Sequence, residues 1–149
     1  MPTSLPSECD LDEFSVPKLQ RTRPVTASQV RSYAGKSQQF ADAAAAELAA
    51  GRPIAATSLA IHAAINAGDA VCGARLGIRA AGEDHSAVLT LLRQAGTDGI
   101  DIEKDLRRLL PMKTQTEYEP DDIGIAEATK AVERSTRCAA VAYRVASAI

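Results

Sequence analysis

Three polar residues share one face of an alanine-rich, mostly apolar segment at residues 53–76. His62, Asn66 and Asp69 are four and three positions apart, so their side chains form one stripe if the segment is helical. An imidazole can serve as a base or a ligand, and a carboxylate can orient it. The stripe is therefore either the floor of a ligand-binding site or part of the core. We expect the second: half-buried side chains that are hydrogen-bonded to a facing helix or to a second copy of the chain.

Charged residues follow this stripe closely. Arg75 and Arg79 come at its end, and Asp84 and His85 precede the next apolar segment, where a helix N-terminus would favour an anion. Together they suggest a site for an anionic ligand such as a phosphate, although Asp69 can instead form an ion pair with either arginine. Arg79 and His85 are also the candidates for a catalytic pair. Because a glycine-marked turn separates them, we expect that they do not act as one.

Other kinds of chemistry have weaker signals. The two histidines have no third ligand at metal spacing, and there is neither a glycine-rich phosphate loop after a strand nor a nucleophile elbow. We therefore predict no metal and no cofactor. Cys9, Cys72 and Cys138 are odd in number and share no short spacing, which argues against a disulfide framework and favours the cytoplasm. The formal net charge of −2 gives no overall attraction to nucleic acid, but a local basic patch remains compatible with it.

Apolar residues recur every three or four positions, which predicts helices throughout residues 26–149. The predicted helices run from Thr26 or Ser28 to Gly51, over about 53–76, over 85–96 with Asp84 as its cap, from about Asp101 to Pro111, and over about 125–148 with Ile125 among its inward residues. The TDG stretch at 97–99 is predicted as a turn, and no segment alternates as a strand does. The fold class is therefore all-α, an antiparallel bundle of four to five helices.

Residues 1–25 differ from this bundle. They contain four prolines, acidic residues followed by basic ones, and apolar residues without a clean period. We predict an extended arm that can lie along a groove of the same chain or of a partner. The first residues lack the pattern of a signal peptide, and the longest apolar stretches contain His, Asn and Asp, so we expect no membrane span and a cytoplasmic protein.

The order of these segments resembles the HEPN domain (higher eukaryotes and prokaryotes nucleotide-binding). The similarity rests on the long second segment LAAGRPIAATSLAIHAAINAGDAVCGARLG, the His-started GEDHSAVLTLL, MKTQTEYEP, and the last amphipathic segment IAEATKAVERSTRCAAVAYRVA. It covers about residues 26–148. The resemblance implies a helical bundle that commonly dimerises. It also implies a partner such as a toxin or a small nucleotidyltransferase, in the setting of toxin–antitoxin pairs.

RNase members of that family carry an Arg, four to six residues, then a His, just before a Tyr. If Tyr118 takes the place of that Tyr, the His position holds Thr116 and the Arg position holds Pro111. Arg79 and His85 satisfy the spacing elsewhere, across the turn that follows residues 53–76. The resemblance therefore implies a domain without the RNase motif at its usual place.

Three functions follow as alternatives. The first is a noncatalytic, antitoxin-like domain that binds a partner protein, with nucleotide or RNA contact through His62, Asn66, Asp69, Arg75 and Tyr118. The second is a metal-independent RNase that uses Arg79 and His85. The third is a structural, dimeric adaptor in which the polar stripe belongs to the core.

Overall fold

The structure is a computed structural model that describes residues 21–82, 84–120 and 122–149. The described part contains two short strands and six helices: β1 (Thr22–Pro24), α2 (Ala27–Ala49), α3 (Pro53–Leu76), β2 (Ile78–Ala80), α4 (Ser86–Leu92), α5 (Gly96–Leu109), α6 (Pro111–Glu117) and α7 (Ile125–Ser147). The predicted all-α bundle is confirmed. Residues 1–20 of the predicted arm lie outside the described residues.

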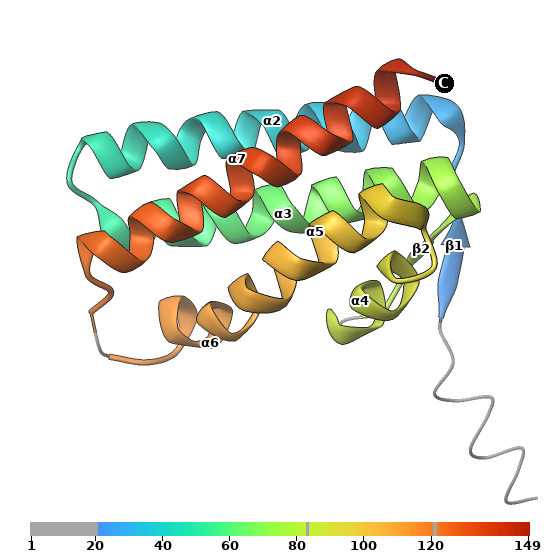
Figure 1. The fold of residues 1–149 in the computed structure, drawn as a ribbon. Coiled ribbons are helices and arrows are strands. Elements are labelled where there is room, and N and C mark those ends of the chain that lie inside the picture. Colours follow the sequence, from blue (N-terminus) through green and yellow to red (C-terminus); the bar gives the residue numbers. More distant parts are fainter. Residues whose placement is uncertain (1–20, 83, 121) are drawn as a thin grey trace, which may run out of the picture.

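The bundle is built around three long helices, α2, α3 and α7, each of which packs against the other two (Figure 1). The apolar residues of α3 occur on all of its faces, which is typical of a core helix and not of an amphipathic one. Many of the buried residues on the three helices are alanines, so the helix axes can approach closely. By length and composition α3 is also the one described helix that could cross a membrane, a test that the core helix of a bundle passes as well.

Local hydrogen bonds fix the start of α2 and its contact with α3. The Thr26 hydroxyl accepts from the Gln29 N–H at 3.1 Å, and the Gln29 side chain accepts from the Thr26 N–H at 3.0 Å, a reciprocal cap that satisfies exposed backbone donors. Further along, the buried Ser37 hydroxyl donates to the Ala63 carbonyl at 2.7 Å. This bond joins α2 and α3 at the residue that follows His62.

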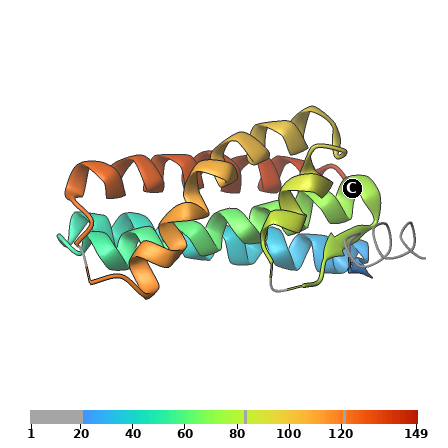
Figure 2. The ribbon, with the colours of Figure 1, turned by 90° about the horizontal axis from the view of Figure 1, so that it is seen from below.

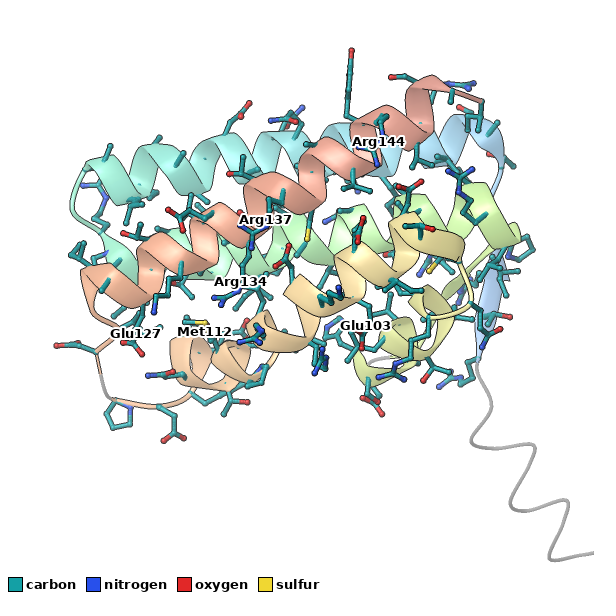
Figure 3. The ribbon with its side chains drawn as sticks, in the orientation of Figure 1. Glu103, Met112, Glu127, Arg134, Arg137 and Arg144 are labelled. Carbon is teal, nitrogen blue, oxygen red and sulfur yellow. The ribbon has the colours of Figure 1, made fainter. Side chains whose placement is uncertain are left out.

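Carboxylates on α5 face arginines on α7, and Figure 3 shows Arg134, Arg137 and Arg144 along that side of α7. Asp98 accepts from Arg144 and from Arg75 of α3, both at 2.7 Å. Asp105 accepts from Arg137 at 2.8 Å. These ion pairs hold α5 against the core on the side of α7.

The two strands form an antiparallel pair that was not predicted from the sequence. They are far apart in the chain, because α2 and α3 lie between them. β1 lies within the segment assigned to the arm, and it pairs with β2 directly after α3. Gly77 makes this possible, because it ends α3 with a positive φ of 74° and its carbonyl accepts from the Val25 N–H at 2.9 Å. The described end of the predicted arm is thus tied to the bundle.

Two details of the prediction were wrong: the TDG stretch is the first turn of α5 instead of a turn between helices, and Ile125 is not an inward residue of α7. The helix α5 ends at Leu109, just before Pro111, as predicted, and Pro111 begins the short α6, which was not predicted. Proline is well tolerated at a first helical position, where no backbone donor is needed. Ile125 is 52% exposed, because it lies in the first turn of α7, beyond the packed part of the bundle.

Candidate binding groove between α2 and α3

A groove of about 490 Å³ opens between α2 and α3, and two residues of the polar stripe lie in it. The lining residues are Lys36, Gln39, Phe40 and Ala43 from α2, and Leu59, His62 and Asn66 from α3. The groove combines a cation, two amides, an imidazole and an apolar floor. Such a surface can hold a flat ring and hydrogen-bond its edge.

His62 and Phe40 form the centre of this groove. Their ring centroids are 5.5 Å apart and the rings are tilted by 34°, a favourable arrangement for two aromatic groups. The Asn66 side chain donates to the His62 carbonyl at 2.8 Å, so its amide is bound within α3. Among the described residues neither His62 nor Asn66 makes a side-chain hydrogen bond to a facing helix, and the other predicted arrangement, hydrogen bonds to a second copy of the chain, stays a prediction. His62 packs on the ring of Phe40.

Asp69 has different surroundings, although it is half-buried as predicted. Burial raises the pKa of its carboxyl to about 7, and the nearby charge of Arg79 lowers it in part. No side chain of the described residues donates a hydrogen bond to this carboxyl within 3.5 Å. Of the two ion-pair partners considered from the sequence, Arg79 is the one beside Asp69.

Arg79 is held in place by its own contacts. Its guanidinium carbon lies 5.8 Å from the centroid of the Tyr33 ring on α2, within range of a cation–π interaction. It also donates to the Ala80 carbonyl at 3.0 Å. Through these contacts Arg79 connects β2 with α2.

His85 directly precedes α4. Both α4 and α6 pack against α3 (Figure 2). Burial lowers the pKa of His85, Lys113 and His62 lower it further, and Asp84 and Glu117 act in the opposite direction. The charges around it thus come from α3 and α6. The N-cap of α4 is His85 and not Asp84 as predicted, but the Asp84 carboxylate accepts from the Ser86 N–H at 2.9 Å, directly before the helix.

The two candidates for a catalytic pair therefore have separate neighbours. Arg79 faces Tyr33 and Asp69, whereas the charged groups that act on His85 lie on α3, α4 and α6. No hydrogen bond joins Arg79 to His85 among the described residues, and that they do not act as a catalytic pair stays a prediction.

Two further predicted ligand residues lie away from the groove. Arg75 forms an ion pair with Asp98 at 2.7 Å, and Tyr118, at the end of α6, is 72% exposed. Their contact with a ligand stays a prediction. Within the described part of the chain, no three His, Cys, Asp or Glu side chains come close enough to hold a metal ion.

Sequence reasoning missed the α2 side of the groove. The spacing of Tyr33 and Phe40 predicts that they lie on the inward face of the first long helix. In the structure both are half-buried; Phe40 contacts His62, and Tyr33 lies beside Arg79. Lys36 was not singled out. The sequence signal for this side of the groove was the presence of Tyr33 and Phe40 in the helix directly before the one that carries the polar stripe.

Neither a protein-family model nor a curated protein matches this chain.

Proposed function

We propose that this chain is a noncatalytic, HEPN-like binding domain, the antitoxin-like member of a toxin–antitoxin-type pair. It binds a partner protein and contacts a nucleotide or RNA through the α2–α3 groove. The observation that carries the proposal is the groove itself, in which His62 and Phe40 face each other beside Lys36 and two amides. A base ring fits such a surface, and the lysine can meet its phosphate.

The separate surroundings of Arg79 and His85 support a noncatalytic role. A metal-free RNase needs a base and an anion-stabilising group on the same phosphate, within hydrogen-bond reach. Arg79 lies over the Tyr33 ring and near Asp69, whereas the charged groups that act on His85 are His62, Asp84, Lys113 and Glu117.

Partner binding can be tested by neutralisation. The protein is co-expressed with candidate toxins, each encoded beside the gene of this chain, and growth of the host is followed. Rescue of growth by the wild type, with a complex that co-elutes from a sizing column, would support the antitoxin-like role. Growth arrest caused by this chain alone and relieved by His85→Ala would support the RNase alternative instead.

The structural-adaptor alternative predicts a different result. A homodimer with an unchanged nuclear magnetic resonance spectrum on addition of nucleotide or RNA would favour it. Shifts confined to α2 and α3 amides around Phe40 and His62 would favour the binding groove.

A further inference from the structure

The two short strands place three arginines on one face of the β1–β2 pair. Arg23 stands directly opposite Arg79 in the antiparallel register. Arg21 shares their side because side chains alternate along a strand, and its carbonyl accepts from the Ala81 N–H at 2.8 Å, which extends the pairing to it. Like charges directly opposite each other destabilise a strand pair. This face therefore gains stability from any bound anion.

Little negative charge on the described chain offsets these arginines. None of its ion pairs involves Arg21, Arg23 or Arg79; the arginines that are paired lie elsewhere. The carboxyl of Asp69 attracts Arg79, but its pKa of about 7 leaves it only partly ionised near neutral pH. Arg21 and Arg23 are both exposed in the described part of the chain.

The arginine face is continuous with the groove. Arg79 lies over Tyr33, at 5.8 Å from the ring centroid. Along α2, Lys36 comes next and then Phe40 with His62 beneath it. Phe40 follows Tyr33 by seven positions, which corresponds to about 10 Å along the helix axis. Cations and rings thus alternate from the β1–β2 pair into the groove.

We propose that Arg21, Arg23 and Arg79 bind the phosphate backbone of a single-stranded nucleic acid whose bases enter the α2–α3 groove. This inference rests on the proposed function and adds the surface that holds the phosphates. A guanidinium binds a phosphate through two parallel hydrogen bonds, and aromatic side chains stack on bases of any sequence. An acidic protein segment would satisfy the arginines but would leave the rings and amides of the groove without a role.

The test is the salt dependence of binding to a fluorescein-labelled single-stranded RNA of twelve nucleotides, followed by anisotropy. The full chain is compared with the double variant Arg21→Gln/Arg23→Gln, whose side chains are exposed, so that the fold is retained. We expect affinity to fall at least tenfold at low salt. The slope of log K against log salt should become shallower by about 1.4, at about 0.7 for each lost contact with a single strand. Arg52→Gln is the matched control, because Arg52 pairs with Glu47 at the far end of the bundle.

The outcomes separate this inference from the proposed function. A double variant with the affinity and slope of the wild type overturns the arginine site, and so does a wild type that binds no RNA at micromolar concentration. Tighter, arginine-dependent binding of an acidic octapeptide also overturns it, in favour of a protein segment. If the double variant behaves as expected but Phe40→Ala binds like the wild type, the arginine site stands and the groove of the proposed function fails.

Discussion

The rings of His62 and Phe40 face each other across the α2–α3 groove, with centroids 5.5 Å apart. The contact joins the polar stripe of α3 to the aromatic side of α2. His62 thus packs against an aromatic ring, and its charge also acts on His85. Its neighbours instead make a surface that opens to solvent, and this surface determines the binding role proposed for the chain.

Asp69 should make the protein less stable as pH rises. The folded-state pKa of about 7 lies well above the ordinary value near 3.8, so the folded state holds a proton that the unfolded state has lost. The stability that this proton provides is complete below pH 4 and is lost as pH rises through 7. The shift corresponds to a few kcal/mol, at about 1.4 kcal/mol per pKa unit.

The variant Asp69→Asn, which keeps the shape of the side chain, isolates this effect. We expect it to unfold at higher urea concentration than the wild type at pH 8, with the difference shrinking toward pH 4. His85, whose pKa is lowered by burial, changes stability in the opposite direction but equally in both proteins. A variant that is less stable than the wild type at pH 8 would show that the ionised carboxylate is satisfied in the fold.

Gly99→Ala should destabilise the packing of α5 on α4. An added Cβ would clash with the Leu92 carbonyl oxygen, a backbone atom that cannot move aside cheaply. We expect a loss of about 1–3 kcal/mol in the free energy of unfolding, measured by urea titration. Gly35→Ala is the control, since nothing lies within 4 Å of its added Cβ; in a helix interior that change should stabilise by up to about 1 kcal/mol. Equal effects at both positions would contradict the close approach.

Asp98→Asn should weaken the attachment of α5 to the core. The carboxylate accepts from Arg75 and Arg144, both at 2.7 Å, and these bonds hold its pKa below the ordinary value. The arginines are partly exposed, so each pair contributes only about 0–1 kcal/mol. We therefore expect a loss of about 1 kcal/mol near neutral pH, which disappears in high salt and as pH falls through the lowered pKa. A salt-independent loss would point to packing instead.

The long helices could be predicted from the sequence, but the small elements could not. Apolar residues spaced by three or four positions predicted α2, α3 and α7, because this spacing repeats over many turns of each helix. The strands have three residues each, too few to alternate visibly. The start of α5 was missed because Gly99, which suggests a turn locally, is required by the approach of Leu92.

The candidate site was predictable only on one side. The spacing of His62, Asn66 and Asp69 put them on one stripe of α3, and that holds. Which residues face the stripe depends on how α2 and β2 pack against α3, and no local pattern encodes this. Phe40 and Arg79 therefore appear as neighbours of the stripe only in the structure.

The central claim is that a noncatalytic domain binds through the α2–α3 groove, and a metal-free titration of labelled single-stranded RNA tests it most directly. Wild type, His62→Ala and the control Gln38→Ala, on the α2 surface beside α7, are compared, and the RNA is then sized by electrophoresis. We expect saturable binding that His62→Ala weakens several-fold and Gln38→Ala leaves unchanged, with the RNA intact. RNA shortened by the wild type but not by His85→Ala, or bound equally by His62→Ala, would contradict the claim.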